Sequence, residues 1–330
     1  MKFPKISIVT PSFNQGEFLE ETIQSVLDQN YPSLEYIVID GGSTDKSKSI
    51  LEKYDKQLTY WVSEKDSGQS EAINKGFKKA TGEIISWLCS DDLYEKNTLK
   101  TVAELFNAYP DAALVHGKTI LFDTIGKELI KGATPEDLAL KYFAVIPFPQ
   151  PSSFFRKSAL DQVGYLDESL HFGMDYELLL RIALNFPIQS VEPILSRYRL
   201  HDQSKTVRQQ AKFADEWLLI FCRFLLSNTT DYSISEQMKS TGIFKDDGIR
   251  YVINSNFTEA ELRLITGYFL YYQLVIYNDL LDKAKSFQLI ELIRRVNPEF
   301  YIQHQLKSIG LKLKILPKGL ISFLRKLMRR

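Results

Sequence analysis

The first hundred residues alternate short apolar runs with amphipathic segments, and this alternation limits the fold more than any other feature of the chain. The apolar runs, typical of buried strands, are residues 6–10, 36–39, 58–62 and 84–88. The amphipathic segments, typical of helices, follow them at residues 17–28, 45–54, 70–79 and 97–109. Repeated strand-helix units favour the α/β class, with a mainly parallel sheet flanked by helices.

The pattern changes along the chain. Further strands are expected at residues 112–121, 128–130, 153–156, 188–191 and 194–200, with a helix at 174–184. Long helical segments follow at 213–226, 259–284 and 287–296. Residues 1–200 carry 21 basic and 28 acidic side chains, a net charge of −7. Residues 201–330 carry 20 basic and 13 acidic side chains, a net charge of +7. We therefore predict an α/β domain over residues 1–205 and a helical region over residues 206–330 with a separate role.

Cysteine content and hydropathy limit the cellular setting. The two cysteines, Cys89 and Cys222, lack the spacing of a zinc site and do not support a disulfide framework. Residues 1–5 lead directly into a strand-like run without a signal-peptide pattern. No stretch reaches the roughly 18 to 20 apolar residues of a membrane-spanning helix. These features predict a cytoplasmic protein.

Acidic motifs follow two of the apolar runs. Residues 40–45 read Asp-Gly-Gly-Ser-Thr-Asp, and residues 90–92 read Ser-Asp-Asp. Open α/β sheets bind ligands outside the carboxyl ends of their strands. Carboxylates there can hold a divalent cation that also contacts phosphates. The sequence therefore predicts a nucleotide site built around a metal.

Four motifs in a fixed order carry a resemblance. They are Thr10-Pro11-Ser12-Phe13-Asn14, residues 40–45, Asp66-Ser67-Gly68 with Asn74-Lys75-Gly76, and Ser90-Asp91-Asp92. Over about residues 5 to 201 the chain resembles glycosyltransferase family 2, whose inverting enzymes have the GT-A fold and use nucleotide sugars. The resemblance implies transfer of a single sugar from a nucleoside-diphosphate donor, expected to be UDP-linked, to a hydroxyl of a glycan or glycolipid during cell-surface polysaccharide synthesis.

The resemblance also implies the nucleotide-binding residues: Thr10, Pro11, Ser12, Asn14, Asp40, Asp66 and Asp91. Gly41 stands where many family members have a second Asp, so the sequence leaves open which nucleotide base the site binds. A purely structural interpretation also stands. Asp40 and Asp45 suit the cap of the next helix, and Asn74 and Gly76 suit a helix end.

The metal site is expected at Asp92 and His201, with Mg²⁺ or Mn²⁺ as the cofactor. Ser90 replaces the first acid of the family motif. A cation at this position would stabilise the charge that collects on the departing diphosphate. The alternatives are solvated loop acids and a structural histidine.

The resemblance assigns the catalytic base to Asp175, which would take the proton of the acceptor hydroxyl. Met174 stands where relatives usually have another acid, and Met174, Gln150 and Arg156 are expected on the acceptor or donor-sugar side. The competing interpretation makes Asp175 a helix N-cap, with Glu177 and Arg181 as a surface pair worth tenths of a kcal/mol.

Residues 301–330 contain no Asp or Glu but carry eight basic residues among Leu, Ile and Phe: Lys307, Lys312, Lys314, Lys318, Arg325, Lys326, Arg329 and Arg330. Such a segment suits peripheral attachment to an anionic membrane surface on its inner face, near lipid-linked glycan acceptors. Binding a partner protein and packing as a terminal helix remain alternatives. No nucleic-acid module is recognised, and no oligomeric state is indicated.

Two other functions stay open. The replacement of common acids by Ser90 and Met174 suits a non-catalytic nucleotide-sugar-binding protein. A sugar-phosphate nucleotidylyltransferase also uses an α/β nucleotide site with Mg²⁺, but the glycine-rich phosphate loop of those enzymes is missing. The missing Gln-x-x-Arg-Trp segment counts against a processive polysaccharide synthase.

Overall fold

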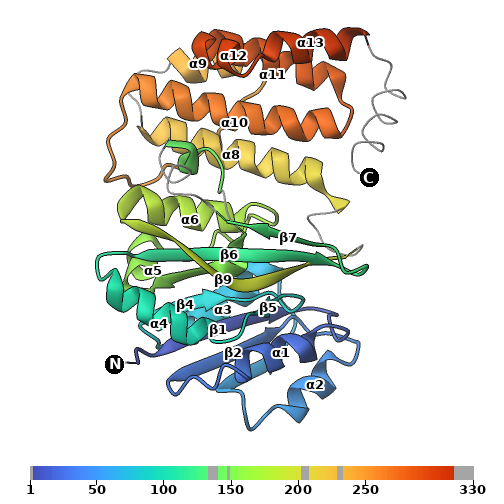
Figure 1. Cartoon of the computed structure of the whole chain (residues 1–330), viewed down its shortest axis with the longest axis vertical. Coiled ribbons are helices and arrows are strands. Elements are labelled where there is room, and N and C mark those ends of the chain that lie inside the picture. Colours follow the sequence, from blue (N-terminus) through green and yellow to red (C-terminus); the bar gives the residue numbers. More distant parts are fainter. Residues whose placement is uncertain (1–2, 133–139, 147–148, 202–207, 229–232, 316–330) are drawn as a thin grey trace. The chain divides into compact units, whose positions relative to one another are not determined.

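The computed structural model describes residues 3–132, 140–146, 149–201, 208–228 and 233–315. The chain divides into two compact units (Figure 1). The first comprises Met1–Leu138 and Ile146–Arg208, and the second comprises Ala139–Val145 and Gln209–Arg330. The short segment 139–145 thus belongs with the helices of the second unit, which no feature of the sequence indicates.

The first unit contains a mixed sheet. Its strands are β1 (Ile6–Ser12), β2 (Leu34–Asp40), β3 (Tyr60–Ser63), β4 (Ile84–Trp87), β5 (Leu93–Tyr94), β6 (Leu114–Asp123), β7 (Glu128–Lys131), β8 (Ser153–Arg156) and β9 (Ile188–Leu200). The order is β3-β2-β1-β4-β8-β6-β9-β5, with β7 paired to β6. The strands β3, β2, β1 and β4 are parallel, whereas β8 runs antiparallel to β4 and to β6. The α/β class is confirmed, and the block of four parallel strands is the region predicted from the alternating pattern, while β6 and β9 form a further parallel pair.

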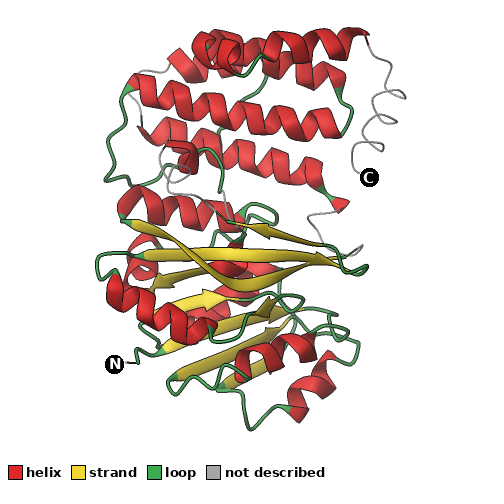
Figure 2. Ribbon diagram, viewed as in Figure 1, coloured by secondary structure: helices red, strands yellow, loops and turns green. Residues whose placement is uncertain are grey.

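Helices cover both faces of this sheet (Figures 1 and 2). They are α1 (Leu19–Leu27), α2 (Ser47–Lys53), α3 (Gln69–Lys79), α4 (Thr98–Ala108), α5 (Lys157–Val163) and α6 (Met174–Asn185), with the 3-10 turn η3 (Gln150–Ser152). Ile6 and Ile8 of β1 share one apolar core with residues of α1, α2 and α4. Because successive strand residues point to opposite faces, Val9 lies toward α3 instead.

The close contact between β1 and α3 explains Gly76. This residue lies inside α3 rather than at its end, and a Cβ there would come within 2.3 Å of Val9 Cγ1. The helix-end interpretation of Gly76 is therefore wrong. Asn74 does not end the helix either, because its side-chain amide donates to Leu166 O at 2.9 Å and accepts from Leu166 N at 3.0 Å. Both residues fix α3 in place.

The sequence pattern predicts two strands where the structure has the single strand β9. The interruption in the pattern is Pro193, and the pairing of β6 with β9 shifts register between His116 and Lys118. Proline cannot donate to a strand ladder and is accommodated at such irregularities. Gly117 lies at the same place, where a Cβ would lie 2.6 Å from Pro193 O.

The second unit is helical. Its elements are η2 (Leu140–Phe143), α8 (Gln210–Asn228), α9 (Ser233–Ser240), α10 (Glu259–Asp279), α11 (Lys283–Val296), α12 (Pro298–Gln303) and α13 (Leu306–Ile315). The predicted helix 259–284 ends earlier, because Leu281 has a left-handed φ of 59° and the Asp282 carboxylate accepts from Lys285 N to start α11. Phe221 stacks on Phe269 in its core, with ring centroids 3.9 Å apart.

The basic C-terminal segment is only partly described. Phe300 and Leu306 are buried in the helical unit, so the first part of the segment packs as ordinary helix. Residues 316–330, with five of the eight basic side chains, lie outside the described residues. None of the described helices combines the length and apolarity needed to cross a bilayer.

Candidate active site

The exit loops of β1 and β2 are tied together at the carboxyl end of the sheet. The Asp40 carboxylate is fully buried and accepts from Ser43 N (2.9 Å), Ser43 Oγ (2.5 Å) and Ser63 Oγ (2.7 Å). Asn14, with a left-handed φ of 52°, donates its N–H to Ser43 Oγ and accepts from Thr44 N. Asp40 therefore orders the loop that leads to α2 rather than capping that helix.

Unlike Asp40, Asp45 contacts the start of helix α2. Its carboxylate accepts from Ser47 N, the first residue of α2, and from Gly16 N at 2.8 Å. Thr10 and Pro11, which precede Ser12 at the end of β1, are also buried. Thr10 Oγ1 shares a hydrogen bond with Tyr36 OH at 3.1 Å, and Pro11 pairs with Ile39 of β2.

Ser12, the last residue of β1, has a buried hydroxyl that finds no hydrogen-bond partner within the described parts of the chain. A buried hydroxyl without a partner is costly. A ligand at the end of β1 would offset that cost, so Ser12 Oγ is a candidate contact for the nucleotide.

Asp66 fills the space that Gly41 leaves open. A Cβ on Gly41 would lie 2.7 Å from Asp66 Oδ2, while Asp66 Oδ1 accepts from Gly68 N at 3.0 Å. Burial raises the pKa of the Asp66 carboxyl, and the charges of Glu71 and Asp40 act in the same direction. The carboxylates of Asp40 and Asp66 thus lie near each other, although the chain has no second Asp after residue 40.

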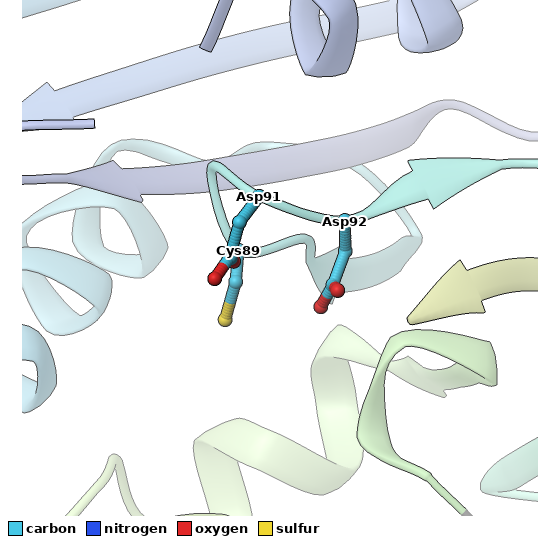
Figure 3. Close-up of side chains that lie close together, drawn as sticks. All are labelled: Cys89, Asp91 and Asp92. Atoms are coloured by element: carbon cyan, nitrogen blue, oxygen red, sulfur yellow. The ribbon is translucent and has the colours of Figure 1, made fainter. Parts of the chain in front are cut away.

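The loop after β4 carries a cluster of three side chains (Figure 3). One ligand atom each from Cys89, Asp91 and Asp92 lies within 4.8 Å of the others. Asp92 is 1% exposed, and its Oδ1 accepts from Arg199 N at 3.0 Å. Its Oδ2 is buried with no hydrogen-bond partner among the described residues. Burial, followed by the negative charge of Asp91, raises the pKa of Asp92 well above its usual value.

Three neighbours hold this loop in shape. Thr22 Oγ1 donates to Ser90 O and Asp92 O, both at 2.9 Å. Arg199 Nε donates to Asp91 O at 3.0 Å. His201 Nε2 and Asp91 Oδ2 are joined by a hydrogen bond of 3.0 Å, and the buried His201 ring packs on Phe18. The structure therefore brings His201 to Asp91, whereas the cluster of ligand atoms around Asp92 contains Cys89 and Asp91 but not His201.

Asp175 is the second residue of α6, and the N-cap position belongs to Gly173. Its Oδ1 accepts from Tyr176 N at 2.8 Å. The N-cap interpretation of Asp175 is therefore wrong. Asp175 lies in the first turn, where the helix dipole favours a negative charge.

The start of α3 contacts both the acidic loop and the start of α6. Gln69 Nε2 donates to Cys89 Sγ at 3.2 Å. Its neighbour Ser70 donates its hydroxyl to Met174 Sδ at 2.8 Å and Leu170 O at 2.9 Å. Two adjacent residues thus join the segment that carries Asp92 to the segment that carries Asp175.

Glu177 and Arg181 do not form a surface pair. Their side chains are 4% and 12% exposed, and two contacts of 2.8 Å join the carboxylate to the guanidinium. Arg181 also donates to the carbonyls of Gly164 and Tyr165 in the connection that follows α5. The pair closes this connection onto α6 and is buried there, so the surface-pair interpretation is wrong.

Gln150 and Arg156, the remaining predicted site residues, lie at opposite ends of β4. Gln150 is buried and donates to Trp87 O at 2.9 Å, at the end of β4 that precedes the acidic loop. Arg156 pairs with Ile84 at the other end of β4 and donates to Ala112 O and Pro110 O. The structure does not bring Arg156 to the acidic loop, and its guanidinium is engaged by backbone carbonyls.

Sequence reasoning missed four side chains that contact the site: Cys89, Gln69, Thr22 and Arg199. Cys89 and Arg199 each lie within two residues of a recognised motif, so their position was a usable signal. Thr22 and Gln69 act through contacts between distant segments and give no local signal.

In the described part of the chain, carboxylates gather at the carboxyl ends of the parallel strands of a mixed α/β sheet, the edge at which open sheets of this class bind ligands. Residues 7–164 match the family model described as Glycosyl transferase family 2. An uncharacterized glycosyltransferase of Mycobacterium tuberculosis (strain CDC 1551 / Oshkosh) is 30% identical over 183 residues, which are 55% of this chain and 70% of that protein. The chain belongs to glycosyltransferase family 2.

Two solved structures share the fold. The structure of S. aureus TarS 1-349 in complex with UDP-GlcNAc has a TM-score of 0.56 and 18% identity, covering 90% of this chain and 91% of TarS 1-349. The mannosyltransferase PcManGT from Pyrobaculum calidifontis, in complex with GDP-Man and Mn²⁺, has a TM-score of 0.55 and 16% identity, covering 98% and 84%.

Proposed function

We propose that this glycosyltransferase is metal-dependent and inverting, and that it moves one sugar from a UDP-linked donor to a hydroxyl of a glycan or lipid-linked glycan in cell-surface polysaccharide synthesis. The observation that carries the proposal is the buried Asp92 carboxylate, whose Oδ2 finds no partner among the described residues. It lies at the carboxyl end of β4, where open α/β sheets bind their ligands.

The residues of the acidic loop fit a divalent cation. Asp92 and Asp91 carry adjacent negative charges in a buried setting, and a cation would offset both the burial and the repulsion. Asp92 and His201 would hold Mg²⁺ or Mn²⁺, with Asp91 oriented by its hydrogen bond to His201. When bound, the cation supplies electrostatic stabilisation for the negative charge of the departing diphosphate. The complex of PcManGT with Mn²⁺ supports this proposal.

The uridine would lie against the tied exit loops of β1 and β2. Asp40 Oδ1 receives one hydrogen bond, from Ser43 Oγ, and keeps capacity to accept the imide hydrogen of uracil. Asp66 and the Ser12 hydroxyl lie at the same edge of the sheet. The complex of TarS 1-349 with UDP-GlcNAc supports UDP as the carrier.

Asp175 would serve as the catalytic base. An inverting transfer needs a carboxylate to take the acceptor proton while the acceptor oxygen attacks the anomeric carbon. Tyr176 N donates to Asp175 Oδ1 at 2.8 Å, which helps to fix the carboxylate in the first turn of α6. Met174 precedes it with a buried thioether, so no second acid competes at that position.

The test uses the full chain with a panel of nucleotide sugars and either Mg²⁺, Mn²⁺ or a chelator. Asp175→Asn should lower transfer by a factor of about 10² to 10⁴ while donor binding in calorimetry stays unchanged. Asp161→Asn, which alters an exposed carboxylate of α5, is the matched control and should keep normal transfer. Normal turnover by Asp175→Asn would remove the base assignment.

The products separate the competing functions. Donor binding with no sugar transferred from any donor would identify a non-catalytic binding protein. Pyrophosphate release from a nucleoside triphosphate and a sugar phosphate would identify a nucleotidylyltransferase. Sugar transfer that persists after a chelator removes divalent cations would contradict the proposed dependence on a metal.

Attachment to the inner face of a membrane is a proposal from the sequence of residues 301–330. Phe300 and Leu306 are buried, so a truncation should keep them. A chain ending at Ile315 removes only residues 316–330 and should lose co-sedimentation with anionic vesicles. Equal sedimentation of the truncated and full chains would remove these residues from the interaction.

A further inference from the structure

The thiol of Cys89 lies inside the acidic cluster. Its Sγ and one oxygen each of Asp91 and Asp92 lie within 4.8 Å of one another. Figure 3 shows the three side chains leaving the same loop, with the Cys89 sulfur and the two carboxylates on one side of it. Asp92 Oδ2 is an independent sign of a ligand position, because it is buried and unpaired among the described residues.

The surroundings of the sulfur suit a metal ligand. Gln69 Nε2 donates to Cys89 Sγ at 3.2 Å, so the sulfur acts as a hydrogen-bond acceptor there. Cys89 is partly exposed, which leaves a path for a cation from solvent. Thiolates are soft ligands that select cations such as Zn²⁺ over Mg²⁺, whereas hard cations keep to oxygen.

We propose that Cys89, Asp91 and Asp92 together bind a thiophilic divalent cation, Zn²⁺ or Cd²⁺, at the position where the proposed function places Mg²⁺ or Mn²⁺. The inference rests on that proposed function for the identity of the competing cation. The thiol releases its proton to solvent as the sulfur–metal bond forms, with no change of oxidation state. Zn²⁺ and Cd²⁺ then displace the hard cation and inhibit transfer, and Cys89 decides which cation the site prefers.

The first experiment titrates the full chain with Cd²⁺ and follows the ultraviolet charge-transfer band of a thiolate bound to cadmium. The wild type should develop this band, and Cys89→Ser should lack it. Cys89→Ser should also bind Cd²⁺ more weakly, by at least the roughly 10- to 100-fold that loss of a supporting contact costs at metal sites. Its Mn²⁺ affinity should stay unchanged. Cadmium binding without the band, or equal Cd²⁺ affinity in both proteins, would overturn the proposal.

The second thiol serves as an internal reference. Cys222 is buried, and burial raises the pKa of its thiol to about 12. It remains in Cys89→Ser, so a band from Cys222 would persist in that variant. In the wild type, Cd²⁺ should protect Cys89 from alkylation by iodoacetamide, as followed by peptide mass mapping. Equal alkylation of Cys89 with and without bound Cd²⁺ would count against the thiolate as a ligand.

These readouts do not require sugar transfer. A cadmium–thiolate band in a protein that transfers no sugar would support the inference and reject the proposed function. Metal-dependent transfer, together with Cys89→Ser that keeps its Cd²⁺ affinity, would reject the inference and leave the function standing.

Discussion

Glu35 and Asp92 are buried carboxylates at opposite ends of the parallel strands, and their pKa values shift in opposite directions. Glu35 is near the start of β2 and is 5% exposed, whereas Asp92 follows the end of β4 and is 1% exposed. Burial acts to raise the pKa of both. At Glu35 the hydrogen bonds from Lys5, Ser7 and Thr81 outweigh burial and lower the pKa to about 2. At Asp92 the pKa stays well above its usual value.

The difference lies in the number of donors. Glu35 accepts from Lys5 Nζ (2.6 Å), Ser7 Oγ (2.5 Å), Thr81 N (2.7 Å) and Thr81 Oγ1 (2.8 Å). Asp92 accepts from Arg199 N, and its second oxygen has no partner among the described residues. Burial alone therefore does not define the role of an acid. The protein completes the hydrogen bonding of the carboxylate near the start of its strands and leaves incomplete that of Asp92 at their carboxyl ends, where open α/β sheets bind ligands.

Among the variants that test the contrast between Glu35 and Asp92, replacement of Asp92 should have the largest effect. Asp92→Asn keeps an oxygen for Arg199 N but removes a buried negative charge beside Asp91. Transfer should fall by roughly 10²- to 10³-fold, as for loss of one electrostatic contact to the developing charge. Donor binding should lose its dependence on Mn²⁺ in calorimetry, while the melting temperature should not fall. A lower melting temperature with normal metal binding would show that Asp92 is a structural acid like Glu35.

Replacement of Arg199 should lower sugar transfer less than replacement of Asp92, because Arg199 positions the acidic loop without contacting a ligand. Its Nε donates to Asp91 O and another guanidinium nitrogen bridges to Glu21. Arg199→Ala should weaken Mn²⁺ binding by about 10- to 100-fold, and kcat should recover at saturating Mn²⁺. Arg197→Ala is the matched control, since Arg197 lies two residues away and pairs with Glu95 and Glu128. Equal loss of Mn²⁺ affinity in both variants would indicate a general effect on β9.

Asp40 is the intermediate case, because it lies at the ligand-binding edge but has three hydrogen bonds. Asp40→Ala leaves Ser43 N and two hydroxyls without their acceptor. The free energy of unfolding should fall by about 2–3 kcal/mol, since unpaired buried donors cost roughly this much. Denaturant titration measures the change. If stability is unchanged while UDP binding is lost, Asp40 belongs with Asp92 rather than with Glu35.

Local patterns predicted the parallel part of the fold. The alternation of apolar and amphipathic segments matches strands β1 to β4 and helices α1 to α4 in type and order, because each of these elements repeats its burial pattern within a few residues. The two-residue strand β5 was not predicted. The break between α10 and α11 was missed. It depends on the left-handed φ of Leu281 and on the Asp282 cap, and no Gly or Pro marks the position.

Prediction of the candidate site was limited in the same way, because only its local features could be read from the sequence. Asp91 and Asp92 were found because an acidic motif follows an apolar run, which is a local signal. Gln69 contacts Cys89 across 20 residues and Arg199 contacts Asp92 across 107. Such contacts depend on how strands and helices are placed in three dimensions. Glu177 and Arg181 have the spacing of a surface pair, and their burial follows only from the docking of the connection after α5.

Glu35 should make the stability of the protein depend on pH. Because its folded pKa is about 2 and lies below the usual value of 4.5, the charged Glu35 stabilises the fold above about pH 4.5. This contribution is lost as the pH falls from about 4.5 through about 2. Glu35→Gln should lower the free energy of unfolding by about 1–2 kcal/mol near neutral pH, allowing for partial solvent screening. The difference from the wild type should narrow as the pH falls through that window.

Glu71→Gln is the matched control for this pH dependence. The pKa of Glu71 is also lowered to about 2, first by the hydrogen bond from Ser67 and then by that from Lys75, but its side chain is 26% exposed, against 6% for Glu35. Its replacement should change stability less than Glu35→Gln does at every pH, because water replaces the lost contacts. Urea titrations of the three proteins across this pH range measure both effects. Equal losses in the two variants would mean that the lowered pKa alone, and not the burial of Glu35 between its donors, accounts for the contrast with Asp92.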